Sequence, residues 1–102
     1  MLLSLNRSNV RHLNLIGPQI RKLRYRMDWS QQMLAIKLQL AGWDVTRSTV
    51  AKIEARVIWV GDFQLFYFTR IFRVTLEDLF PIIDQHDPKI HDTITKLMEI
   101  RM

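Results

Sequence analysis

The chain contains no cysteine, so disulfide bonds and cysteine-ligated zinc sites are excluded. It also has no apolar window that approaches the length of a membrane-spanning helix. The opening Met-Leu-Leu-Ser-Leu is too short for the apolar core of a signal peptide, and Asn6 and Arg7 follow it directly. We therefore expect a cytoplasmic protein that makes no contact with a membrane.

Patterns typical of catalysis or of metal binding are lacking as well. The sequence offers no serine, histidine and acid arrangement and no glycine-rich phosphate loop. His86 and His91 lie near Asp87 and Asp92, but positions five apart do not share a helix face. We expect no enzyme activity, no metal and no cofactor.

Acidic residues are scarce in the first sixty positions, where ten Lys/Arg stand against three Asp/Glu and give a net charge of +7. The remaining residues carry five basic and seven acidic side chains, a net charge of −2, so the whole chain of 102 residues has +5. A basic half of this kind is what contact with nucleic-acid phosphates requires. The alternative interpretation is a solvated charged surface with no nucleic-acid partner, which is common in small proteins.

Strand-like alternation, internal repeats and low-complexity segments are absent, whereas helical spacing recurs along the chain. Ile16, Ile20 and Leu23 predict a helix over about 17–26. Ser30 is a suitable N-cap for a second helix, and Gly42 a suitable residue to end it. We expect its buried stripe to contain four residues: Met33, Leu34, Leu38 and Leu40.

A third helix is predicted over 46–55, capped by Thr46 or, alternatively, by Asp44. Its first turn carries Arg47, Ser48 and Thr49, while Val50 and Ile53 point to the other side. Three more helices are predicted: 62–72 capped by Asp62, 76–80 capped by Thr75, and an amphipathic helix that starts at Asp87-Pro88. The predicted fold class is all-α.

In this order the residues resemble one known family. The matching segments are Ile16-Gly17, Ile20-Arg21-Lys22-Leu23-Arg24, Trp29-Ser30-Gln31, Leu34-Ala35, Arg47-Ser48-Thr49-Val50, Ile53-Glu54 and Val74-Thr75-Leu76-Glu77-Asp78-Leu79-Phe80-Pro81. They resemble the phage repressor and Cro-like helix-turn-helix proteins, also called the Xre family. The resemblance covers 15–81, about two thirds of the chain, between an N-terminal segment 1–14 and a C-terminal helical extension 82–102.

The resemblance implies a five-helix domain whose third helix reads the DNA major groove, usually as a homodimer on a pseudo-palindromic operator. By position, Arg47, Ser48 and Lys52 look like base-contacting residues, with Thr49 beside them. Gln31 looks like a residue that holds a phosphate and braces the reading helix. It also implies a buried ion pair between Arg24 and Glu54. The chain departs from the family at Arg73, which follows the fourth helix at a position where the family often has glycine.

The chemistry of these side chains agrees with such a role. The Arg47 guanidinium can donate two parallel hydrogen bonds to guanine, which discriminates bases by about 1–3 kcal/mol, although it can also contact a phosphate. Arg21, Lys22 and Arg56 are candidates for contacts with phosphates, like Gln31 at its helix N-terminus. The segment 39–45 is longer than in compact family members, so it either extends the second helix or loosens the turn.

The fourth predicted helix is rich in aromatic residues. Leu65, Phe68, Thr69 and Phe72 suffice for a core face, which leaves Phe63, Phe66 and Tyr67 on a second face. Contiguous exposed aromatic side chains usually form a partner surface, and we interpret this face as a homodimer interface. Packing against the N-terminal segment or the last helix is the alternative.

The sequence therefore predicts a sequence-specific, dimeric regulator of transcription, most simply a repressor, whose partner is double-stranded DNA. A second hypothesis belongs to another class: a protein-interaction module on the same scaffold, such as an antitoxin whose tail neutralises a toxin. The aromatic face and the last helix favour this second hypothesis, whereas the face from Arg47 to Lys52 favours DNA binding.

Overall fold

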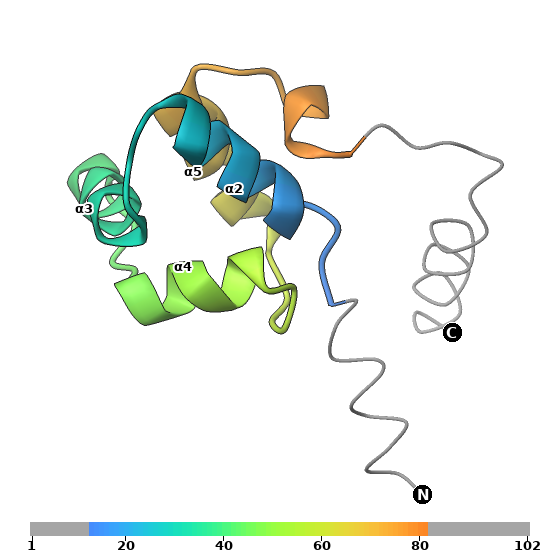
Figure 1. Cartoon of the computed structure of the whole chain (residues 1–102), viewed down its shortest axis with the longest axis horizontal. Helices are drawn as coiled ribbons and strands as arrows, with labels where there is room; N and C mark the ends of the chain where they lie inside the picture. Colours follow the sequence, from blue (N-terminus) through green and yellow to red (C-terminus); the bar gives the residue numbers. More distant parts are fainter. Residues whose placement is uncertain (1–12, 82–102) are drawn as a thin grey trace, which may run out of the picture.

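The computed structural model describes residues 13–81; the segment 1–12 and the predicted helical extension 82–102 lie outside the described residues. The described chain is all-helical, without strands, and no helix in it is long and apolar enough to cross a membrane. It forms four α-helices and one 3₁₀ turn: α2 (Gly17–Arg26), α3 (Gln31–Ala41), α4 (Arg47–Glu54), α5 (Asp62–Phe72) and η1 (Glu77–Leu79). In Figure 1, α2 and α5 lie side by side above α4, and α3 closes one end.

The helices begin where short polar residues supply caps. The Ser30 hydroxyl accepts a hydrogen bond from the Met33 amide at 3.0 Å, and the Thr46 hydroxyl accepts one from the Thr49 amide at 3.2 Å. Each cap satisfies an amide that has no partner within its helix. Both caps were predicted from the sequence, and Thr46 rather than Asp44 is the cap of α4.

All four helices end in the same way. A residue in the left-handed region follows each last turn: Asp28, Gly42, Arg56 and Arg73, with φ of 61°, 116°, 66° and 56°. The next amide then donates back to a carbonyl five positions earlier, as Trp29 does to Arg24 at 3.1 Å and Val74 does to Thr69 at 3.1 Å. This pattern satisfies the last carbonyls of a helix and reverses the chain. Only one of the four positions is glycine, so three of them carry a conformational cost.

The segment 39–45, left open by the sequence, forms a tight turn. α3 ends at Ala41, Gly42 reverses the chain, and the Gln39 side-chain amide donates to the Val45 carbonyl at 2.7 Å. Val45 itself is buried. The first residues of the segment therefore belong to α3 and the others close its end, and the connection to α4 is held by the Gln39 side chain and by the buried Val45.

The core lies between the four helices and is filled by aliphatic side chains with a run of aromatic rings along one side. Ile20, Leu34, Leu38 and Val50 have no exposed surface. The rings of Trp29, Phe72, Phe68 and Trp43 follow one another with centroids 5.8, 6.3 and 5.5 Å apart. Such pairs contribute on the order of 0.5–1.5 kcal/mol beyond the area they bury.

Several predictions of detail were wrong. The fifth predicted helix, 76–80, is only the 3₁₀ turn η1, because Thr75 and Asp78 cap each other over three residues and Pro81 follows. Residues 13–81 therefore form four α-helices and one 3₁₀ turn, where the sequence predicted five helices. The N-cap of α5 is Gly61 instead of Asp62, since the Gln64 side chain accepts the Gly61 amide proton at 2.8 Å.

The expected buried stripe of α3 was also partly wrong. Met33 is 42% exposed and Leu40 82% exposed, while Leu34 and Leu38 are fully buried. Ala35 completes the buried side. α3 packs on α4 and α5, so it buries a narrow face, and apolar residues off that face stay in contact with solvent.

Candidate functional site

The first turn of α4 is the most exposed polar part of the helix. Arg47 and Ser48 are exposed and Thr49 is half-buried, whereas Val50 and Ile53 on the opposite side are at most 1% exposed. The apolar side packs against α2 and α3. The Thr46 and Thr49 hydroxyl groups lie 3.3 Å apart and bond to each other, so Thr49 is committed in part to the cap. α4 is therefore held by its inner face while its outer face stays free for a ligand.

One further polar residue extends this outer face. Lys52 is exposed, and it lies one helical turn beyond Ser48, so the two share a strip of the surface. Arg47 begins the neighbouring strip. The single acidic residue of α4, Glu54, is 3% exposed and is neutralised internally, so it does not oppose an anionic ligand.

A buried network lies beneath α4 and joins three helices. Arg24 Nε and Nη2 donate to the two carboxylate oxygens of Glu54 at 2.7 and 2.9 Å, which is a bidentate pair. Arg24 Nη1 donates to the Trp29 carbonyl at 2.9 Å, and Arg21 Nε lies 3.4 Å from Glu54. The Arg24 side chain is 8% exposed and the Glu54 side chain is fully buried. The pair implied by the resemblance is therefore formed, and it ties α2 to α4.

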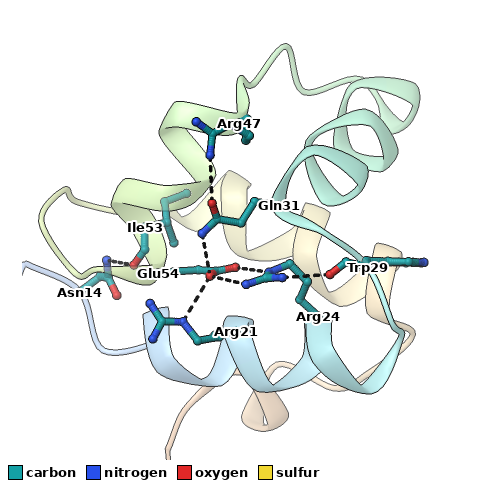
Figure 2. Close-up of polar contacts among 8 residues, drawn as sticks. All are labelled: Asn14, Arg21, Arg24, Trp29, Gln31, Arg47, Ile53 and Glu54. Carbon is teal, nitrogen blue, oxygen red and sulfur yellow. Dashed lines mark hydrogen bonds and ion pairs between the residues drawn. The ribbon is translucent and has the colours of Figure 1, made fainter.

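Gln31 connects this network to the outer face. Its side-chain nitrogen donates to Glu54 Oε1 at 3.1 Å, and its side-chain oxygen accepts from Arg47 Nη1 at 3.3 Å. Figure 2 shows the Gln31 side chain beside α4, between Arg47 and Glu54, with a dashed line to each of them. One residue of α3 thus contacts both the first and the last residue of α4.

Burial and hydrogen bonding have opposite effects on Glu54. Desolvation by burial raises the pKa of Glu54. The hydrogen bonds from Arg24 and Gln31 lower it by a larger amount, so the pKa lies below its ordinary value. The hydrogen bond to Glu54 likewise raises the pKa of Arg24 against the effect of its burial. Both groups are charged at neutral pH.

A second contact between α2 and α4 was missed by the sequence reasoning. Asn14, 6% exposed, donates to the carbonyl oxygens of Ile53 and Ile58 at 3.1 and 3.0 Å, and it accepts from the Gly17 amide at 2.8 Å. A methyl group on Gly17 would overlap the Ile53 carbonyl. Asparagine three positions before a helical glycine is a capping pattern, but its long-range partners lie about forty residues away and leave no trace in the local sequence.

The candidate phosphate-contacting residues differ in how exposed their side chains are and in whether they bond to other parts of the protein. Lys22 is exposed, and the Arg21 side chain is 49% exposed while it leans on Glu54. Arg56 is half-buried, its Nε donates to the Asn14 carbonyl at 2.9 Å, and burial lowers its pKa. Part of the Arg56 side chain is therefore used to hold Asn14, just before α2.

The aromatic face lies on α5, which packs on α2, α3 and η1, away from the outer face of α4. Phe63 is 78% and Phe66 69% exposed, whereas Tyr67 is half-buried with its ring 5.8 Å from that of Trp43. Next to Phe66 is an apolar groove of about 280 Å³. Its lining residues are Asp62, Leu65, Phe66, Thr69, Val74 and Leu76.

Within residues 13–81, no group of histidine, aspartate and glutamate side chains could hold a metal ion, and the residues from His86 to Asp92 lie outside that range. The chain was compared with models of protein families, with curated proteins and with solved structures, and none of the three comparisons gives a match.

Proposed function

We propose that this protein is a sequence-specific DNA-binding regulator of transcription, a helix-turn-helix protein of the repressor and Cro-like type that acts as a dimeric repressor. The observation that carries the proposal is the construction of α4: an exposed first turn with Arg47 and Ser48 over a fully buried opposite face. An α-helix fits the major groove, and residues at its N-terminal end reach base edges there. In this proposal α3 and α4 are the helix-turn-helix pair.

The charge distribution supports the same proposal. Around α4 the cationic groups Lys52, Arg21 and Lys22 are exposed, and the only acid of the helix is paired internally. Gln31 begins α3, where free amide groups and the positive end of the helix dipole favour a phosphate. Each contact that neutralises a phosphate adds roughly 0.9 to the slope of log affinity against log salt.

A homodimer would place two copies of α4 on successive major grooves. The exposed rings of Phe63 and Phe66 and the neighbouring apolar groove support an interface on α5. α4 and α5 both pack on α2 and α3, and pairing through the exposed rings of α5 would leave the exposed first turn of α4 open in both copies. A two-fold operator with half-sites about 34 Å apart would follow from such a dimer.

The direct test is selection of bound fragments from a random pool of duplex DNA at fixed, moderate salt. The wild type is compared with Arg47→Ala/Lys52→Ala. The matched control is Arg26→Ala/Arg73→Ala, which removes the same charge from exposed positions at the end of α2 and just after α5.

We expect the wild type and the control to enrich one two-fold-related motif, and the Arg47→Ala/Lys52→Ala protein to lose or relax it. Weak, salt-sensitive binding that is the same in all three proteins would contradict the proposal. Equal loss in the control and in the α4 variant would mean that net charge, rather than readout by α4, drives the enrichment.

The alternative function is a protein-interaction module, and the exposed apolar groove on α5 is the observation that favours it. Sedimentation equilibrium at micromolar concentration separates the two uses of this surface. A dimer that Phe63→Ser/Phe66→Ser converts to a monomer supports the repressor. A wild-type monomer without DNA selectivity supports the interaction module.

A further inference from the structure

Gln31 has an unusual position because it contacts both ends of α4. Its nitrogen lies 3.1 Å from Glu54 in the last turn, and its oxygen lies 3.3 Å from Arg47 in the first turn. Both contacts are drawn in Figure 2. Arg47 is exposed, and within the described residues it makes no ion pair, so this oxygen is its one side-chain partner there.

An amide side chain has one donating end and one accepting end. Whichever end faces Glu54 therefore determines which end faces Arg47. An ionised carboxylate only accepts hydrogen bonds, so Glu54 can hold Gln31 only by its NH₂ group. The accepting oxygen must then point to the other end of α4, where a guanidinium offers only donors.

Glu54 itself is fixed by the ion pair below it. The two hydrogen bonds from Arg24, at 2.7 and 2.9 Å, hold the carboxylate plane, and its side chain is fully buried. Its pKa lies below the ordinary value, so the carboxylate stays ionised and acceptor-only at neutral pH.

We propose that the buried Arg24–Glu54 pair positions Arg47 through Gln31, so that the ion pair at one end of α4 orients the exposed arginine at the other end. Gln31 is a positioning residue in this relay: it converts a buried negative charge into a correctly placed acceptor on the surface. The relay exists in the free protein, and its value for DNA reading rests on the function proposed above. An arginine already held in place loses less side-chain freedom on binding.

The relay is tested first in the free protein, without DNA, by NMR relaxation of the arginine Nε–H groups. Gln31→Met removes both ends of the amide, and Gln31→Lys keeps a donor toward Glu54 but offers Arg47 no acceptor. Gln32→Met is the matched control, because Gln32 is exposed on the next position of α3. The exposed Arg70 gives the level of a mobile side chain in the same molecule.

We expect Arg47 to be more ordered than Arg70 in the wild type and in Gln32→Met, and to fall to the level of Arg70 in both Gln31 variants. The decisive variant is Arg24→Met/Glu54→Leu, which leaves Gln31 and Arg47 untouched. Its Arg47 should be mobile too, because the Gln31 side chain has then lost its hydrogen bond to the buried carboxylate and is no longer anchored at that end. An Arg47 that is as mobile as Arg70 in the wild type, or that stays ordered in Arg24→Met/Glu54→Leu, overturns the relay.

DNA binding is the second readout. At the base pair that Arg47→Ala shows to be read, Gln31→Met should lower selectivity by about 2- to 12-fold, as expected when one long side chain must be ordered on binding. Gln32→Met should leave selectivity unchanged. If Arg47 loses its order in the Gln31 variants but the wild type shows no DNA selectivity, the proposed function is wrong and the relay still holds. Wild-type selectivity that is indifferent to Gln31→Met would overturn the use of the relay in reading.

Discussion

Replacing Glu54 by leucine should be among the most damaging single changes in this domain. The substitution keeps the bulk of the side chain and removes the carboxylate that accepts from Arg24, Arg21 and Gln31. The Arg24 guanidinium, with a side chain 8% exposed, then keeps the Trp29 carbonyl and the Tyr25 ring, 4.7 Å away, but has no counter-charge. Leaving a buried charge without its counter-charge costs about 3–5 kcal/mol.

This cost is a large part of the stability of a small domain, which is typically about 5–15 kcal/mol. For a domain of this size each kcal/mol lowers Tm by about 4–8 °C, so the loss is on the order of 12–40 °C. Arg24→Met/Glu54→Leu removes both charges, and replacing a buried pair by apolar residues is often neutral or stabilising by about 1–4 kcal/mol. The double variant should therefore be more stable than the single one.

The assay is urea denaturation followed by far-UV circular dichroism at neutral pH, with the denaturant slope compared between variants. Glu77→Leu is the matched control, since Glu77 is exposed on η1 and its replacement should stay within about 0.5 kcal/mol of the wild type. The reasoning is refuted if Glu54→Leu costs less than about 1 kcal/mol, well under the cost of an unpaired buried charge. It is refuted as well if the double variant is as unstable as the single one.

The same pair predicts how stability depends on pH. The pKa of Glu54 is lower in the folded protein than its ordinary value of 4.5, so the folded state favours the ionised carboxylate. Its contribution is complete above the pKa of the unfolded chain, and it is lost as pH falls through the lower folded value. Asp78, whose pKa is lowered by its bonds to Thr75, contributes in the same direction. Arg24→Met/Glu54→Leu should lose the first contribution and keep the second, as urea midpoints measured at several acidic pH values will show.

Three further predictions concern the helix ends. Arg73→Gly should raise stability by about 0.5–1 kcal/mol in thermal unfolding, because φ is 56° there. Arg70→Gly inside α5 is the control and should lower stability by about 1 kcal/mol. An equal effect at both positions would contradict the left-handed conformation of Arg73. Gly17→Ala should destabilise the domain by about 1–3 kcal/mol although alanine has the better helix propensity, because the methyl group meets the Ile53 carbonyl. A stabilised protein would show that α2 can move aside. Asn14→Leu removes the side-chain partner of the Ile58 carbonyl and of the Gly17 amide, at about 1–3 kcal/mol each, whereas the Ile53 carbonyl keeps its bond from the Arg56 amide. Urea denaturation measures the loss, and a cost below that range would mean that water replaces the side chain.

Local chemistry explains why so much of the fold was predictable. The caps Ser30 and Thr46 and the reversal at Gly42 depend on residues within one or two turns of each other. The bounds of α2 and α5 follow in the same way from Pro18 in the first turn and from the spacing of apolar residues. These are interactions between sequence neighbours, so a single sequence contains them.

Exposure could not be predicted in the same way. Met33 and Leu40 fit a helical apolar stripe, but which part of that stripe is covered depends on how many elements pack on α3 and at which angle. Tyr67 was expected on an open face, and the ring of Trp43, which follows the turn of Gly42, covers part of it instead. The angle between helices is a property of the packed core.

The sequence by itself determined the all-helical class, the order of the helices, the caps of α3 and α4 and a polar first turn on α4. Only the tertiary structure decided what holds that turn in place. Asn14 meets Ile53, and Gln31 meets both Glu54 and Arg47, across separations of sixteen to thirty-nine residues. Hydrogen-bond partners so far apart become neighbours only when apolar burial packs the helices together, because the ordering entropy of each contact alone exceeds what one hydrogen bond returns.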